Sequence, residues 1–431
     1  MAPGSGLAAL ASLRRWRPGL LARNSGHALL WQLVRAVCLA LYLWLLARLL
    51  GPAQYGLLVA VLSLASIAGT LNGGGIGVLL LREGVRNPQA VPAIWIRSCG
   101  AVLVGFPVCF ALYALAVRCL IPARVDYSIW IPLGISEIAL SALSNAAASG
   151  LQSREKLGWS GALLAVPALG RLFAAVFLSA AVEIPTLSAY AALQLGCALA
   201  GTGIVLSFQQ WRSAGRRFFA LGEAWNWWWQ GSGFSAMYLV ALAAVDLDKS
   251  LVLKNSNAET AGYYALGYRV VMTFALPVTA LVQALMPRLV RQISVSAGSP
   301  ARTTFIAAAA VLAYSLLAAL CLGEFGRNLI SLFGSAYSKL DAMIPGYCLL
   351  LVIYNLRCIA GVLLYAENRP WSRAAIEGVA IGLVVVCSAV LVPRYGLSGA
   401  LATAVVSETW IFLFSWVLAL RLLRGKAPPG S

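Results

Sequence analysis

Four ionisable side chains lie inside long apolar segments: Arg35, Arg269, Asp248 and Glu408. A charged side chain in hydrocarbon costs several kcal/mol, so such a group normally faces a protein interior or a water-filled cavity. Arg35 and Arg269 each lie eight residues into an apolar segment. That places each of them about 12 Å deep in a bilayer core about 30 Å thick. Guanidinium groups at this depth predict an anion site, because each offers a planar fork of donors and stays charged when desolvated.

The acidic residues leave alternatives open. Arg269 could instead pair with an acid on another helix, such as Glu408, and Glu408 could couple transport to protons if it can be protonated. Asp246 and Lys249 are three residues apart on one predicted helix and are expected to pair. Asp248 lies on a different face of that helix and has no obvious local partner, so we assign it to the substrate site.

Glu137 and Arg171 are expected to form a structural ion pair. They lie on the two arms of a predicted helical hairpin, and their mean position falls in the middle of the connecting loop. They should therefore lie at equal depth and be able to pair. Removing one partner of a buried ion pair is strongly destabilising, because the other charge is left without compensation. Arg97 and Arg357 are close enough to one membrane face to extend toward the headgroups, and we expect that of both.

Two local patterns have simple structural interpretations. The four tryptophans at 225 and 227–229 precede a predicted span, where tryptophan usually anchors a helix at the membrane interface. Stacking on a sugar is the alternative. The run Asn72-Gly73-Gly74-Gly75 interrupts an apolar segment and is expected to permit close helix packing.

The composition indicates a polytopic membrane protein. The chain has 431 residues, 61% hydrophobic and 11% charged, with a mean hydropathy of +0.84. Its backbone should be helical throughout, because a spanning segment must satisfy its own hydrogen bonds. The net charge of +18 comes from short basic loops, so nucleic-acid binding is not expected. His27 is the only histidine and the nine cysteines form no CxxC pattern, so neither a metal nor a cofactor is expected.

We predict about twelve transmembrane helices in two six-helix lobes. The lobes follow from three matching motifs at nearly constant offsets: Tyr55-Gly56-Leu57 with Ala261-Gly262-Tyr263, Pro185 with Pro393, and Trp159-Ser160 with Trp371-Ser372, at offsets of 206, 208 and 212. The expected spans are 27–50, 55–81, 93–118, 127–150, 158–181, 186–210, 231–254, 261–286, 303–323, 342–365, 371–392 and 396–420.

The predicted organisation has five parts. They are an N-terminal segment (1–26), an N-lobe (27–210), a surface linker (211–230), a C-lobe (231–420) and a tail (421–431). Nineteen basic residues fall in segments on the side of the N-terminus and six in loops on the other side. This asymmetry predicts that both termini lie in the cytoplasm.

The chain resembles the O-antigen type of polysaccharide flippase in the multidrug/oligosaccharidyl-lipid/polysaccharide (MOP) exporter superfamily. The resemblance spans nearly the whole chain and rests on residues 50–57 (LGPAQYGL), Asp248-Lys249, 262–269 (GYYALGYR), 287–289 (PRL) and 393–400 (PRYGLSGA). It implies alternating-access translocation of an undecaprenyl-pyrophosphate-linked oligosaccharide across a bacterial cytoplasmic membrane, for surface polysaccharide synthesis. It also implies a monomer that meets membrane lipids and other polysaccharide assembly proteins.

Two other functions remain open. A cation-coupled multidrug exporter of the same superfamily would need acidic residues in its cavity, whereas the candidate set here is mixed. An integral-membrane glycosyltransferase or polymerase would need charged groups on a sizeable outer loop. The longest outer loop, Gly323–Asp341, is about as apolar as its flanks. We therefore expect a transporter and not an enzyme.

Overall fold

The computed structural model describes residues 20–121, 125–207, 221–294, 299–367 and 369–424, and in these ranges every regular element is a helix. The predicted linker at 211–220 and most of the N-terminal segment and tail lie outside the described residues. The main helices are α2 (Leu20–Arg86), α3 (Val91–Leu120), α4 (Tyr127–Ile135), α5 (Ser141–Gln152), α6 (Leu157–Ala181), α7 (Leu187–Ser207), α8 (Leu221–Asn255), α9 (Ala258–Phe274), α10 (Leu276–Ser294), α11 (Pro300–Ser331), α12 (Ile344–Ala366) and α13 (Pro370–Arg424). Short 3₁₀ or π segments at Pro88–Ala90, Ser136–Leu140 and Ser335–Met343 join them.

The helices make this a multi-pass membrane protein. Eight helical stretches in the described ranges are long and apolar enough to cross a bilayer, or nine if the bent pair α9 and α10 is one span. Two of the eight, within α2 and α13, are 57 and 53 residues long, about twice the length that one crossing needs. The total of twelve crossings stays a prediction.

Both long helices are kinked at a glycine with a left-handed backbone. Gly51 has φ 68° in α2, and Gly396 has φ 56° in α13. A side chain disfavours positive φ, so glycine is the residue that permits these breaks. Each glycine is close to a proline, Pro52 or Pro393, which removes a further helical hydrogen bond. The motifs at 50–57 and 393–400 thus mark the two points where a long helix changes direction.

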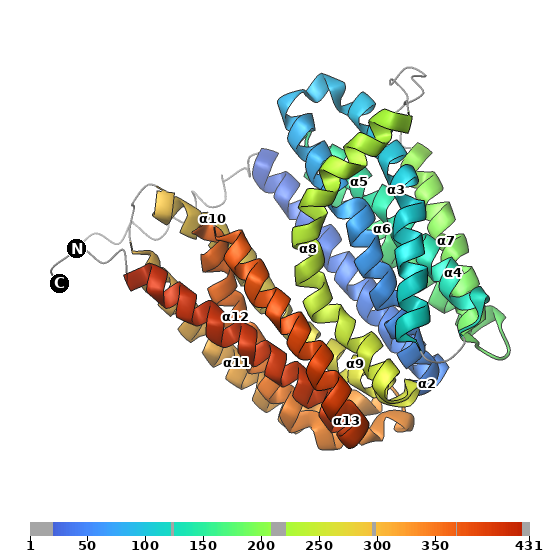
Figure 1. The fold of residues 1–431 in the computed structure, drawn as a ribbon, viewed down its shortest axis with the longest axis vertical. Helices are drawn as coiled ribbons and strands as arrows, with labels where there is room; N and C mark the ends of the chain where they lie inside the picture. The colour runs from blue at the N-terminus through green and yellow to red at the C-terminus, as the bar shows by residue number, and fades with distance from the viewer. Residues whose placement is uncertain (1–19, 122–124, 208–220, 295–298, 368, 425–431) are drawn as a thin grey trace, which may run out of the picture.

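The helices form two groups (Figure 1). Helices α2 to α7 lie on one side and α10 to α13 on the other, with α8 and α9 running between them. The two groups converge at the end where α2 and α13 turn, and they diverge toward the end where α10 and the start of α2 lie. The division into lobes at 27–210 and 231–420 stays a prediction, since α8 and α9 belong by sequence to the second lobe but lie between the two groups.

The converging end is closed by a reciprocal glycine contact. A Cβ atom on Gly56 would collide with the carbonyl oxygen of Ala258, and a Cβ atom on Gly262 would collide with that of Pro52. The contact is reciprocal: Gly56 packs on Ala258, four residues before Gly262, and Gly262 packs on Pro52, four residues before Gly56. The first pair of motifs that predicted the repeat therefore lies together in space, in a nearly two-fold relation.

Helix α8 begins earlier than expected. Residues 221–230, predicted as linker, form its first turns. Trp227 and Trp228 are buried there, and their indole N–H groups donate to Ser98 Oγ and Asn72 Oδ1, each at 3.2 Å. Interfacial anchoring was therefore the wrong interpretation for these two tryptophans. Indole N–H groups need partners when buried, and α2 and α3 supply them.

The glycine run in α2 permits close packing, as predicted. A Cβ atom on Gly73 would collide with Ala142, and one on Gly75 with the carbonyl oxygen of Gly231. Asn72 is buried beside them and donates to the carbonyl oxygens of Val102 and Ile138, at 3.2 and 2.9 Å. The start of α8 is therefore fixed against the first group of helices.

Candidate anion site

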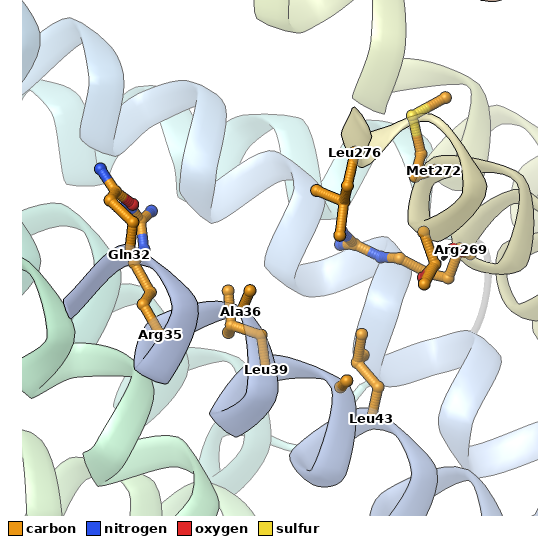
Figure 2. A pocket seen from close by; sticks show the side chains of 10 residues that line it. Gln32, Arg35, Ala36, Leu39, Leu43, Arg269, Met272 and Leu276 are labelled. Atoms are coloured by element: carbon orange, nitrogen blue, oxygen red, sulfur yellow. Dashed lines mark hydrogen bonds between the residues drawn. The ribbon is translucent and has the colours of Figure 1, made fainter. Parts of the chain in front are cut away.

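Arg35 and Arg269 line one cavity of about 270 Å³ between α2 and α9. Arg269 reaches across it toward α2, while the side chain of Arg35 rises beside Gln32 (Figure 2). Neither arginine forms an ion pair with another described residue. The remaining wall is largely apolar, including Ala36 and Leu39. Two cations without ion-pair partners beside apolar side chains are suited to hold an anion, because an apolar wall screens their charge less than bulk water does.

A second cavity of about 100 Å³ adjoins the first. The two share Leu39, Leu43 and Arg269, and the second adds Arg171 and Asp246. Arg269 therefore lies between them. The described residues of the two linings include three arginines and one carboxylate, so this part of the lining carries a net positive charge.

Arg171 makes the contact with Glu137 that its position in the hairpin predicts. Its Nη2 lies 2.5 Å from Glu137 Oε1, and Gln194 Nε2 donates to the same oxygen at 3.2 Å. Glu137 is buried in the π segment Ser136–Leu140. Arg171 also lines the smaller cavity. Its sequence position gave no signal of that second contact, since only the packing of α6 on α2 brings it there.

We expect Glu137 and Arg171 to act mainly in folding. Arg171→Ala leaves the buried carboxylate of Glu137 without its cation, which costs about 3–5 kcal/mol. Glu137→Ala leaves Arg171 unpaired, and its cost should be smaller because that side chain is partly exposed to the smaller cavity. The yield of folded protein, measured by fluorescence-detected size-exclusion chromatography, should therefore fall in both variants. The exchanged double variant Glu137→Arg/Arg171→Glu should recover much of it. Two single variants that fold at wild-type yield but do not transport would instead assign the pair to substrate handling.

Asp246, and not Asp248, lies on the cavity wall. Asp248 is buried beside Lys249, whose Nζ lies 3.0 Å from Asp248 Oδ1 and 3.2 Å from Asp246 Oδ1. The hydroxyl of Tyr264 donates to Asp248 Oδ2, and Lys249 Nζ lies 4.0 Å above the ring of Tyr268. The pairing of Asp246 with Lys249 was predicted. The expectation that Asp248 lacks a partner was wrong, because the flexible lysine side chain folds back along the helix to reach both carboxylates.

Glu408 pairs with Arg357. Their Oε2 and Nε atoms are 2.6 Å apart, and both side chains are more than nine-tenths buried. The expectation that Arg357 extends to the membrane face was wrong. The alternative that Glu408 pairs with Arg269 was also wrong, because Glu408 pairs with Arg357 instead. The pair joins α12 to the second half of α13, two segments that are not consecutive. Any ion coupling through Glu408 would have to act on this ion pair.

Arg97 also has partners within the protein. Its Nη2 lies 3.6 Å from Glu223 Oε2, and its guanidinium lies 5.4 Å from the centre of the Trp227 ring. The contact with the start of α8 was not predicted. The extension of Arg97 toward the headgroups stays a prediction, because both side chains of the pair remain partly exposed. In the described part of the chain, no three or more His, Cys, Asp and Glu residues group so as to hold a metal ion.

Comparison with known proteins gives a family and a fold. A family model described as "Polysaccharide biosynthesis protein" matches residues 21–293. A search of curated proteins found no match. Solved structures match over almost the full length. An inward-facing multidrug resistance MATE family transporter of the MOP superfamily has a TM-score of 0.71 at 10% identity, covering 92% of this chain and 99% of its own.

Two further solved structures share the fold. The lipid II flippase MurJ, in an inward closed conformation, has a TM-score of 0.67 at 12% identity, with 93% of this chain and 94% of its own covered. The MATE multidrug transporter DinF-BH, in complex with R6G, has a TM-score of 0.65 at 18% identity, with 94% and 95% covered. At these identities the likeness establishes the fold alone. The same fold thus occurs in a lipid flippase and in drug transporters, so the site has to decide the substrate.

Proposed function

Since this chain belongs to the polysaccharide biosynthesis protein family and has the fold of the MOP transporters and flippases, we propose that it translocates a polyprenyl-pyrophosphate-linked oligosaccharide across the cytoplasmic membrane of a bacterium. The family and the fold make it a MOP-type transporter or flippase. The substrate, the membrane, the cytoplasmic termini and the monomeric state are parts of the proposal.

One observation carries the choice of substrate: two arginines without ion-pair partners in the described chain line a shared, mostly apolar cavity between α2 and α9. A pyrophosphate presents several oxygens to such forks of donors. Leu33, Val37 and Leu41 form an exposed apolar stripe on α2 beside the cavity wall. A polyprenyl tail could remain in the bilayer along that stripe while its headgroup enters between the helices.

Alternating access supplies the movement. The glycine contact between Gly56 and Gly262 closes one end of the interface between the helix groups, and the arginine cavity lies toward the other end. Exchange between this arrangement and one closed at the opposite end would expose the same site to each side in turn. With the N-terminus in the cytoplasm, the arrangement described here is the inward-facing one.

The drug-exporter alternative is tested by the same site. A multidrug exporter that moves cations would need carboxylates in its cavity, because a buried cation requires a partner of opposite charge. Here Asp246 is the one acidic residue among the described residues that line the two arginine cavities, and it is already paired with Lys249. The positive lining favours an anionic headgroup over a cation.

Reconstitution into lipid vesicles tests the proposal. Vesicles with the protein should move a fluorescent polyprenyl-pyrophosphate trisaccharide between leaflets, as read by quenching from one side, and should leave a cationic dye in place. Transport of the dye without transport of the glycolipid would establish the drug exporter instead.

We expect the membrane potential to drive the transport. A pyrophosphate carries about two negative charges, so outward movement from a negative interior could gain roughly 5 kcal/mol at 100 mV. A potassium gradient with valinomycin should therefore accelerate outward translocation in vesicles, and the reversed gradient should slow it. Equal rates at both polarities and at zero potential would rule this driving force out.

A further inference from the structure

A third cavity, of about 670 Å³, lies between α2, α5, α6 and α8. Its lining combines apolar side chains and glycines with the neutral polar side chains of Thr70, Asn145, Ser149, Gln152 and Tyr238. No charged side chain lines it within the described residues. It therefore differs in chemistry from the two arginine cavities.

Most of these polar side chains form no hydrogen bond within the described part of the protein. The Ser149 hydroxyl donates to the backbone oxygen of Asn145 at 3.1 Å. The side chains of Thr70, Asn145, Gln152 and Tyr238 form no hydrogen bond with other described residues. Two carboxamides and two hydroxyls without partners would be costly in hydrocarbon. They are suited to a space that holds water or a hydroxyl-rich ligand.

This neutral cavity adjoins the arginine cavities along two helices. On α8, Val245 lines the neutral cavity and the next residue, Asp246, lines the smaller arginine cavity. On α2, Thr70 and Ser66 line the same two cavities and are about one helical turn apart. A ligand with its anionic group at Arg269 could thus extend a neutral portion between α2 and α8.

We propose that the neutral cavity is the glycan subsite, which binds uncharged sugars of the substrate while the arginines hold its pyrophosphate; this rests on the proposed function. The amides of Asn145 and Gln152 can each donate to one sugar hydroxyl and accept from its neighbour. The ring of Tyr238 offers a flat apolar surface to a sugar face. A sugar carboxylate would lose its hydration here and gain no cation, so acidic sugars bind poorly in this cavity.

Binding measurements on the purified full-length protein test the subsite. Three ligands are compared by calorimetry: a short polyprenyl pyrophosphate, the same lipid with a neutral trisaccharide, and the lipid with a trisaccharide of uronic acids. Wild type should bind the neutral glycolipid most tightly. Asn145→Leu and Gln152→Leu should each weaken that binding roughly tenfold, the loss expected for one or two neutral hydrogen bonds, and leave the sugar-free lipid unaffected. Arg269→Ala should weaken binding of all three.

Two controls separate the subsite from folding. Gln283→Leu replaces an exposed glutamine of α10 that lines none of the cavities described, and it should bind like wild type. Tyr238→Leu on α8 tests the same cavity from another helix, in case a change on α5 lowers the thermal melting midpoint. The subsite would be overturned if its variants weakened binding of the sugar-free lipid as much as binding of the glycolipid. It would also be overturned if the variants left binding of both ligands unchanged. A wild type that binds the acidic glycolipid as tightly as the neutral one would overturn it too. A wild type that binds no pyrophosphate ligand would instead overturn the proposed function.

Discussion

Arg269→Ala is expected to abolish export of the lipid-linked glycan while the protein folds at wild-type yield. Arg269 is exposed to the cavity and forms no ion pair with a described residue, so its removal leaves no buried charge unpaired. Hydrogen bonds to charged groups contribute about 1.5–3 kcal/mol each, so loss of a bidentate contact should reduce transport by about a hundredfold or more. Arg269→Lys should restore only part of it, because an ammonium keeps the charge without the planar fork. Initial rates in vesicles give the measurement.

The same order of transport rates is expected at Arg35: lowest with alanine, intermediate with lysine and highest with the native arginine. Arg327→Ala is the matched control, because Arg327 is exposed on α11 and lines none of these cavities. If Arg269 were only a partner of Glu408, removing both charges together would restore transport. Glu408 lies 2.6 Å from Arg357 instead, so the double variant Arg269→Ala/Glu408→Ala should be inactive. A functional double variant would contradict the anion site.

Gly56→Ala and Gly262→Ala are each expected to reduce transport to near background. A Cβ atom at either position would meet a backbone carbonyl oxygen of the facing segment, and a backbone atom cannot move aside as a side chain can. The two helix groups should therefore fail to close at this end. Alternating access needs closure there in one of its two states, so the cycle should stop while the lobes themselves remain folded. Vesicle transport and the thermal melting midpoint, measured together, distinguish this from unfolding.

Gly323→Ala is the matched control for the glycine contact. Gly323 lies in helix α11, and a Cβ atom there would meet nothing within 4 Å. That variant should transport at the wild-type rate. Because the contact is reciprocal, Gly56→Ala and Gly262→Ala should have similar effects. Wild-type transport by both would show that the contact plays no part in the cycle.

The sequence by itself determined the class of the protein and part of the candidate anion site. Apolar segments of spanning length require helices, since no water is available inside a bilayer to bond a free backbone group. Distance from a loop sets the depth of a residue, and on that ground the sequence predicts that Arg35 and Arg269 lie near mid-membrane. Glu137 and Arg171 lie on consecutive arms of a hairpin, where equal distance from the loop means equal depth. Those two residues are in contact in the structure.

The tertiary structure decided which residues face one another across helices that are not consecutive. Depth alone could not pair Arg357 with Glu408, because a further helical segment separates them along the chain. It could not show that Asp246, and not Asp248, lines a cavity, or that Arg171 reaches the wall beside Arg269. It could not show that α8 begins among α2 and α3, where Trp227 and Trp228 are buried. A sequence fixes the order of side chains around each helix, but the rotation and neighbours of that helix follow from the packing of all the others.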